Sequence, residues 1–262
     1  MEPEKRRNVL GVLILAAGLF VMAALFFFLL SPADAGRPPK GQELPAPSLS
    51  EDLTTEPNPL LEPSPLPEAV QLSEEELFGQ AAFLGNSCVE RLFLQGFAPQ
   101  ADFLSRTNLT VSTAFTQGLS RGRGSAVDQL SSGKAYRRIY IMFGENELGW
   151  PDSATFASEY ARLLDAVFAA QPGARVYVQS IPPVTAAKSA RGDFGVTNER
   201  IAEYNALLKS LAREKGAVFL DIAAALRDAS GALPEEASSD GVHMTREYGE
   251  KWITYIKKHV VE

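Results

Sequence analysis

The sequence predicts an α/β protein that folds as a three-layer α/β/α sandwich around a five-stranded parallel sheet. The main observation is that short apolar runs alternate with longer amphipathic segments over residues 73–262, as in folds with parallel sheets. Composition agrees, because 45% of the 262 residues are hydrophobic, which excludes a disordered chain. The single cysteine also excludes an internal disulfide framework.

Short apolar runs indicate the strands. Four are clear in the sequence, and a further strand is expected at Ala101–Leu104. Parallel strands need long crossover connections, so helices are expected between them. The four runs are AAFLG at 81–85, RIYIMFG at 138–144, ARVYVQSI at 174–181 and AVFLDI at 217–222.

Two long helices are predicted between the later strands. Residues Ser153–Ala170 carry apolar side chains at spacings of three and four, and residues Asn198–Lys215 repeat this pattern. Gly173 and Gly216 follow the two segments, where a glycine is the favoured C-cap residue. Each helix is therefore expected to cover the sheet with one apolar face.

The N-terminal part of the chain is predicted to be a membrane anchor. Residues 9–30 contain neither charge nor proline, and as a helix they would reach about 33 Å, enough to span a bilayer. Basic residues 5–7 precede this run, so residues 1–8 are expected in the cytoplasm and the rest outside. Cleavage after the Ala-Asp-Ala sequence at 33–35 is the alternative, although the apolar run is long for a secretory signal.

Residues 31–72 differ sharply in composition and are predicted to form a Pro-rich disordered linker. Ten of the seventeen prolines lie here, with too few apolar side chains to form a core. The sequence Ser-Glu-Glu-Glu at 73–76 then matches a capping box, which marks the first helix of the folded domain, residues 73–262.

The net charge and the small number of metal-ligating residues narrow the possible functions. The formal net charge of −7 argues against a nucleic-acid partner, whose phosphates select basic proteins. Two histidines and one cysteine are too few for a dedicated zinc site, and no metal is expected. The sequence does not indicate an oligomeric state.

Reactive side chains follow three of the predicted elements. The first strand leads into Gly-Asn-Ser-Cys at 85–88, the 138–144 strand into Glu-Asn-Glu at 145–147, and Asp240 and His243 precede the last helix. Ligands of open parallel sheets bind beyond the carboxyl ends of the strands. A serine activated by an imidazole, itself oriented by a carboxylate, is the arrangement that nucleophilic catalysis requires.

The segments FLGNSCVERL, FGENELGW and SDGVHMT resemble the first, third and fifth blocks of the SGNH (GDSL-type) esterases and acylhydrolases. The resemblance covers residues 80–262, and the three blocks occur in the family's order. It implies that Ser87 is the nucleophile, His243 the base and Asp240 the residue that orients it, with no cofactor. It also implies an oxyanion hole formed by the Ser87 amide, Asn108 and the Asn146 side chain.

The sequence departs from the family pattern at two positions. Asn86 stands where the first block usually has Asp, which removes a charge but keeps shape and hydrogen bonding. Asn108 stands where the second block has Gly, and Asn is among the few residues that tolerate a left-handed backbone. Both changes leave the predicted triad intact but raise the chance of reduced activity or a narrowed substrate range.

Several other residues have competing interpretations. Ser120 lies in a Gly-x-Ser-x-Gly match, but the Arg- and Gly-rich sequence after it predicts a loop instead of a nucleophile elbow. Cys88 is expected in the core. Glu145 and Trp150 are predicted to bind substrate, although Trp150 could equally cap the next helix. Glu145 and Glu147 could be a carboxylate pair, but alternate residues of an extended turn point apart.

These expectations combine into one functional hypothesis. The chain is predicted to be a membrane-anchored, extracytoplasmic serine esterase that hydrolyses short-chain, acetyl-type esters on cell-wall or surface glycans. An O-acyltransferase acting on a surface glycan is the closest alternative. A catalytically weak glycan-binding module, suggested by Asn86 and Asn108, is the alternative from another class.

Overall fold

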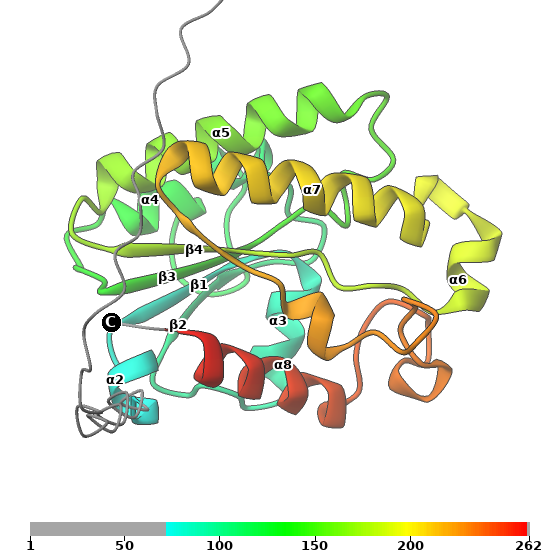
Figure 1. Ribbon diagram of the computed structural model, residues 1–262. Helices are drawn as coiled ribbons and strands as arrows, with labels where there is room; N and C mark the ends of the chain where they lie inside the picture. The colour runs from blue at the N-terminus through cyan, green and yellow to red at the C-terminus, as the bar shows by residue number, and fades with distance from the viewer. Residues whose placement is uncertain (1–71, 261–262) are drawn as a thin grey trace, which may run out of the picture. The chain divides into compact units, whose positions relative to one another are not determined.

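The computed structural model describes residues 72–260, and this part of the chain forms an α/β domain with a five-stranded, wholly parallel sheet. The strand order is β2-β1-β3-β4-β5, so the connections change direction at β1 and β3 (Figure 1). The strands are β1 (Ala81–Gly85), β2 (Asp102–Ser105), β3 (Arg138–Met142), β4 (Arg175–Gln179) and β5 (Val218–Leu220).

Helices cover both faces of the sheet, which gives the predicted three layers. One face carries α4 (Ala126–Leu130), α5 (Ser153–Ala170) and α7 (Asn198–Lys215) (Figure 1). The opposite face carries α2 (Glu74–Phe78), α3 (Ser87–Leu94) and α8 (Arg246–His259). The remaining elements are α6 (Ala186–Arg191) and the short 3₁₀ turns η1 (Thr113–Phe115), η2 (Asp193–Gly195), η3 (Ile222–Ala225) and η4 (Glu235–Ala237).

Side chains of the central strands alternate between two hydrophobic cores. On β3, Ile139 and Ile141 point toward α5 and α7, whereas Tyr140 and Met142 point toward α3 and α8. All five residues of β1 and of β3 are buried, as expected of strands covered on both faces. The sheet is thus buried between the two helical layers, and the loops that follow the carboxyl ends of its strands are left to form a site.

Most of the expected elements lie where the sequence predicts them. The bounds of α5 and α7 agree with the predicted helices, and β2 is the further strand, shifted by one residue. Ser73 and Glu76 form the predicted capping box, with both reciprocal hydrogen bonds present. Gly216 is the left-handed C-cap of α7, with φ of 76°.

The prediction that Gly173 caps α5 is wrong. The helix ends at Ala170 and its C-cap is Gln171, which has φ of −135° and ψ of 64° and so is not left-handed. The Gln171 side chain accepts a hydrogen bond from the Tyr136 amide and donates to the Leu130 carbonyl. These bonds to the segment that leads into β3 end the helix without a left-handed glycine.

The predicted cytoplasmic segment 1–8, the anchor at 9–30 and the linker at 31–72, except its last residue, lie outside the described residues. Within residues 72–260, no helix is both long and apolar enough to cross a membrane.

Candidate active site

Three chain segments that carry the predicted site residues leave the same edge of the sheet. Gly85, the last residue of β1, is in register with Ser105 on β2 and with Met142 on β3. The loops after these strands therefore begin side by side. This places the turn to Ser87, the loop with Asn108 and the loop with Asn146 at one site, at the point where the strand connections change direction.

Ser87 is the first residue of α3 and follows β1 after a single intervening residue. The turn is tight, because a Cβ atom on Gly85 would lie 2.5 Å from both the Met142 carbonyl oxygen and a methyl of Val89. Asn86 is fully buried, and its Oδ1 caps the helix by accepting from the Cys88 amide at 3.0 Å. The Ser87 amide has no acceptor within the helix, as at any helix start.

Asn86 uses its side-chain oxygen to cap α3, in keeping with the hydrogen bonding that the sequence predicts Asn to retain in place of Asp. Its Nδ2 is buried and has no hydrogen-bond partner among the described residues. A carboxylate would lack this unpaired donor but would add a buried charge beside Ser87. The departure from the family pattern therefore leaves the turn without a charge, while the side chain still caps the helix.

Asp240 is held by hydrogen bonds from its own loop. Its Oδ1 accepts from the amides of Val242 at 2.9 Å and His243 at 2.8 Å. The Ser238 hydroxyl lies 2.9 Å from Asp240 Oδ1 and accepts from the Gly241 amide at 2.9 Å. Partial burial tends to raise the pKa of Asp240, but these bonds and the bond to the His243 ring hold it well below its usual value.

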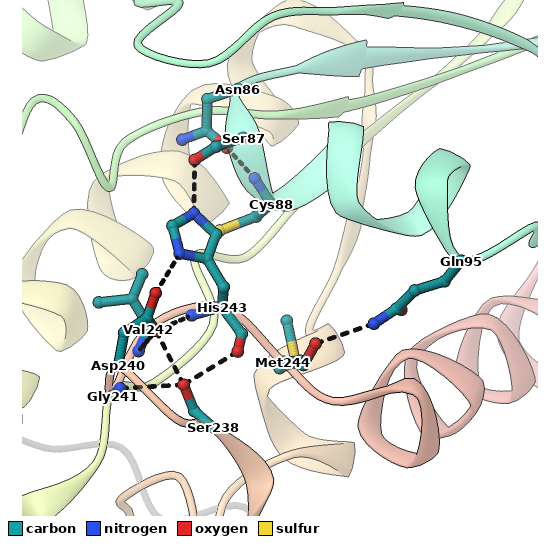
Figure 2. A network of polar contacts seen from close by, with 10 residues as sticks. All are labelled: Asn86, Ser87, Cys88, Gln95, Ser238, Asp240, Gly241, Val242, His243 and Met244. Atoms are coloured by element: carbon teal, nitrogen blue, oxygen red, sulfur yellow. Dashed lines mark hydrogen bonds and ion pairs between the residues drawn. The ribbon is translucent and has the colours of Figure 1, made fainter.

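The side chains of Ser87, His243 and Asp240 form one hydrogen-bonded chain (Figure 2). His243 Nδ1 lies 2.7 Å from Asp240 Oδ2, and His243 Nε2 lies 2.8 Å from Ser87 Oγ. Because Asp240 is ionised, Nδ1 carries the proton in the neutral ring and Nε2 is free to accept one. The structure thus brings together the three residues that the sequence singled out.

Gly241 allows the 238–243 loop to approach the neighbouring segment. Its φ is 86°, in the left-handed region, and a Cβ atom there would lie 2.6 Å from the Lys188 Cβ. The Gly241 carbonyl also accepts from the Thr185 amide at 3.0 Å. The loop that presents His243 is therefore fixed against the start of α6.

Asn108 and Asn146 line the same cavity, and the loops that carry them are connected by a hydrogen bond to Leu109. Asn146 Nδ2 donates to the Leu109 carbonyl at 2.9 Å, which uses one of its two hydrogens. Asn108 is exposed and has a φ of 60°, so the left-handed conformation expected from its sequence context is present. The second Nδ2 hydrogen of Asn146 remains for another acceptor.

Glu147 is a fully buried carboxylate whose role the sequence did not reveal. Its Oε1 accepts from the Val111 amide at 2.7 Å and its Oε2 from the Gly144 amide at 3.0 Å. Burial raises its pKa to about 7, although both bonds oppose this effect. Both oxygens of Glu147 are thus occupied by backbone amides, and the residue joins the loop of Asn108 to the loop of Asn146.

A cavity of about 450 Å³ adjoins these loops. The two predicted substrate-binding residues, Glu145 and Trp150, line this cavity. Trp150 does not cap α5, because the N-cap of that helix is Asp152. Burial raises the pKa of Glu145, and the nearby charges of His243 and Lys188 oppose this rise. The residues lining the cavity are Asn108, Glu145, Asn146, Gly149, Trp150, Lys188, Phe194, Val196 and Val242.

Ser120 and Cys88, the two other candidate nucleophiles, have surroundings that differ from those of Ser87. Ser120 is exposed in a loop that follows neither strand nor helix directly, and its amide donates to the Ser105 carbonyl at 3.1 Å. Cys88 is buried, and desolvation raises the pKa of its thiol well above the ordinary value, which disfavours the reactive thiolate. Within residues 72–260 the histidine that could act as a base, His243, has its Nε2 beside Ser87 Oγ instead.

The geometry fits attack on an acyl carbonyl. An alcohol nucleophile has a base 2.8 Å away, the base has an ionised partner, and amide donors lie on the adjacent loops. Nowhere in the described range 72–260 do three or more His, Cys, Asp or Glu side chains gather in a way that could hold a metal ion.

Comparisons with known proteins agree with this fold. Residues 83–248 match the GDSL-like Lipase/Acylhydrolase family. No curated protein matches the chain in sequence. Among solved structures, a GDSL-like lipase from Bacteroides thetaiotaomicron is 15% identical, with a TM-score of 0.53 over 72% of this chain and 90% of that one.

Two further solved structures share the fold. A carbohydrate acetylesterase from Sinorhizobium meliloti, Est24, is 18% identical, with a TM-score of 0.51 over 68% of this chain and 96% of that one. A proposed platelet activating factor from Streptococcus pneumonia is 20% identical, with a TM-score of 0.56 over 69% and 83% of the two chains. At such low identity these similarities establish the architecture alone.

Proposed function

The chain belongs to the GDSL-like lipase/acylhydrolase family, and from this membership we propose that it is a serine esterase that cleaves short-chain, acetyl-type esters with Ser87, His243 and Asp240. The observation that carries the proposal is the continuous hydrogen-bonded chain from Asp240 through His243 to Ser87, with contacts of 2.7 and 2.8 Å. Enzymes of this family are esterases and acylhydrolases, so the activity class follows from the membership.

In the first half of the reaction, Ser87 Oγ attacks the acyl carbonyl carbon while His243 Nε2 takes its proton. Asp240 stabilises the imidazolium that forms, because its carboxylate lies 2.7 Å from Nδ1 and stays ionised. His243 then gives the proton to the leaving alcohol as the carbon–oxygen bond breaks. The acyl group remains on Ser87.

In the second half, water replaces the alcohol and the same groups act in reverse. His243 takes a proton from water, the resulting hydroxide attacks the acyl-enzyme, and Ser87 leaves with the proton returned by His243. The free acid and the unmodified serine are the products. An acceptor hydroxyl in place of water would give acyl transfer, which is the alternative chemistry for the same site.

The oxyanion of each tetrahedral intermediate requires hydrogen-bond donors. We assign this role to the amides of Ser87 and Asn108 and to the free Nδ2 hydrogen of Asn146. Two features support the assignment: the Ser87 amide has no helical acceptor, and Asn146 is already fixed by its bond to Leu109. Preorganised donors of this kind need no rearrangement when the charge develops.

The proposed substrate class is an acetylated glycan or another small ester. The cavity beside Asn146 is small and has polar side chains on its wall, which suits a short acyl group and a hydroxylated alcohol better than a long alkyl chain. A carbohydrate acetylesterase also shares the fold, which supports the same class.

We propose that the enzyme is anchored in the cell membrane by residues 9–30, with residues 31–72 as a linker and residues 73–262 outside the cytoplasm. Support comes from the uncharged apolar run and the basic residues before it. The test is to fractionate cells expressing the full chain and to treat intact spheroplasts with protease. Recovery of the intact, protease-protected protein from the cytosol would contradict the proposal.

The test of the catalytic proposal is hydrolysis of a short activated ester by the purified protein. Ser87→Ala is expected to lower kcat by at least about 10⁴-fold, because it removes the nucleophile. Ser120→Ala, an exposed serine in the competing motif, is the matched control and should retain full activity. Loss of activity in the control with retention in Ser87→Ala would overturn the assignment.

Adding an acceptor glycan to this assay, and measuring glycan binding beside it, separates the alternative functions. If only acylated acceptor glycan forms, and free acid does not, the protein is an acyltransferase. If the wild-type protein binds acetylated glycan without turnover and Ser87→Ala binds equally well, it is a binding module. The esterase releases free acid, the acyltransferase forms acylated acceptor, and the binding module forms neither, so the three functions can be told apart.

A further inference from the structure

Phe194 is an exposed aromatic side chain at the edge of the cavity. Its exposed fraction is 88%, the highest among the large hydrophobic residues of the described segment 72–260. Its backbone is also unusual, with φ of 56° and ψ of 28°, a left-handed conformation that bulky side chains rarely adopt. A residue chosen for folding alone would be expected to avoid both features, since glycine or asparagine fits such a position better.

The backbone of this residue is pressed against the loop that carries Asn146. A Cβ atom on Gly149 would lie 2.9 Å from the Phe194 carbonyl oxygen, and one on Gly195 would lie 2.6 Å from the Leu148 carbonyl oxygen. Glycines at these two positions let the two segments touch. Strain held in place by its surroundings is typical of residues positioned for a function.

The position of the turn is fixed from the other side as well. Asp193 Oδ2 accepts from Arg191 Nε at 3.1 Å and lies 3.7 Å from Lys188 Nζ. The Gly195 amide donates to the Gly192 carbonyl at 3.0 Å. Phe194 therefore extends from a constrained turn, and the position of its backbone is set by the fold.

The cavity beside Phe194 combines an aromatic edge with hydrogen-bonding groups. Its aromatic members are Trp150 and Phe194. Its polar members are Asn108, Glu145, Asn146 and Lys188. An alkyl chain would leave the polar groups unpaired, whereas a sugar ring has an apolar face for aromatic rings and hydroxyls for the polar groups. The composition of the wall thus matches a hydroxylated ring.

We propose that Phe194 is a specificity-determining residue that stacks against a sugar ring of the alcohol part of the substrate. The inference rests on the esterase function proposed above and names the substrate class of the same site. Because the ring is so exposed, the group it contacts extends out of the cavity, beyond a short acyl group bound next to Asn146. The binding of such a ring would cover apolar surface that is in contact with water in the free protein.

The experiment compares two esters and three variants of the full chain. The esters are trifluoroethyl acetate, which lacks a ring, and methyl 6-O-acetylglucoside, which has a sugar ring with free hydroxyls. Phe194→Asn removes the aromatic ring but suits the left-handed backbone, and Phe194→Tyr keeps the ring. Leu94→Ala, which removes an exposed apolar side chain at the end of α3, is the matched control.

We expect Phe194→Asn to lower kcat/KM for methyl 6-O-acetylglucoside about tenfold, mainly through KM, since stacking is lost. Its kcat/KM for trifluoroethyl acetate should stay within about twofold of wild type, and Phe194→Tyr and Leu94→Ala should match wild type on both esters. An equal loss on both esters would show that Phe194 only supports the loop. No loss on either ester would show that it does not contact the substrate.

A binding measurement keeps this test independent of catalysis. Binding of cellohexaose, followed by tryptophan fluorescence, should weaken in Phe194→Asn and persist in Phe194→Tyr. If wild type hydrolyses neither ester but shows this binding pattern, the esterase proposal fails and the sugar subsite stands. If the Asn substitution instead weakens only adhesion to anionic phospholipid vesicles, Phe194 is a membrane contact and the sugar subsite is excluded.

Discussion

The two halves of the site are held together in different ways. In the half that contains the base, Asp240 is fixed by amides and a hydroxyl from residues 238–243, so one short loop carries its own support. In the half that carries the proposed oxyanion donors, called the oxyanion half below, the loop of Asn108 and the loop of Asn146 are joined through the buried carboxylate of Glu147. Local support can be recognised in a sequence motif, whereas support across loops depends on the tertiary fold.

Among the variants that test this comparison, the largest effect, a loss of kcat, is expected for substitution of Asn146. Asn146→Ala removes both the proposed oxyanion donor and the bond to the Leu109 carbonyl, and it should lower kcat for a short activated ester by about 10²- to 10³-fold. KM should change little, because the donor acts mainly on the charge of the transition state. Steady-state kinetics of the purified variant measures both constants.

The matched control is Asn205→Ala on α7. Asn205 also bonds a backbone segment, since it accepts from the Ile181 amide at 2.7 Å and donates to the Ile181 carbonyl at 3.0 Å. Its loss should lower the free energy of unfolding by about 1–3 kcal/mol and leave kcat nearly unchanged. If both variants lose kcat equally, Asn146 has a structural role and the oxyanion assignment is wrong.

The next effect concerns the pH dependence of stability and arises from Glu147. Its pKa in the folded protein is about 7, above the usual 4.5, so the native state keeps a proton that the unfolded chain loses between these values. The stability that this group contributes is complete below about pH 4.5, falls as the pH rises, and is lost once the pH has passed about 7. The loss is on the order of 3 kcal/mol.

Glu147→Gln should remove this part of the pH dependence, because the variant has no proton to release at this position. Urea unfolding at pH 5 and at pH 7.5 gives the difference for wild type and variant. Glu159→Gln, on the surface of α5, is the control and should keep the wild-type slope. An unchanged slope in Glu147→Gln would mean that Glu147 is ionised throughout this range.

The sequence predicted the elements whose signals are local. The helices Ser153–Ala170 and Asn198–Lys215 were predicted with their correct bounds, because their apolar spacing and flanking residues are read within one segment. Gly173 was wrongly predicted as a cap, since Gln171 ends that helix through bonds to a distant segment. Sequence spacing contains no signal for such contacts.

The same reasoning applies to the site. Ser87, Asp240 and His243 were predicted because the short segments around them resemble family blocks, and the structure brings their side chains into contact. Glu147 was considered only as a partner of Glu145, since a buried carboxylate and an exposed one look the same in a sequence. Phe194 was missed because an exposed phenylalanine resembles any core residue until its surroundings are known.

The smallest effect is expected at Asn108, and it separates side-chain from backbone contributions in the oxyanion half. Asn108→Gly should keep kcat within about threefold of wild type, because glycine adopts the φ of 60° without strain and retains the amide donor. Asn108→Val should lower kcat about tenfold or more, since a β-branched residue resists the left-handed region and would shift that amide. If the Gly variant loses as much activity as the Val variant, the Asn108 side chain itself contributes to catalysis. The oxyanion half would then depend on side chains from the loop after β2 as well as on its backbone.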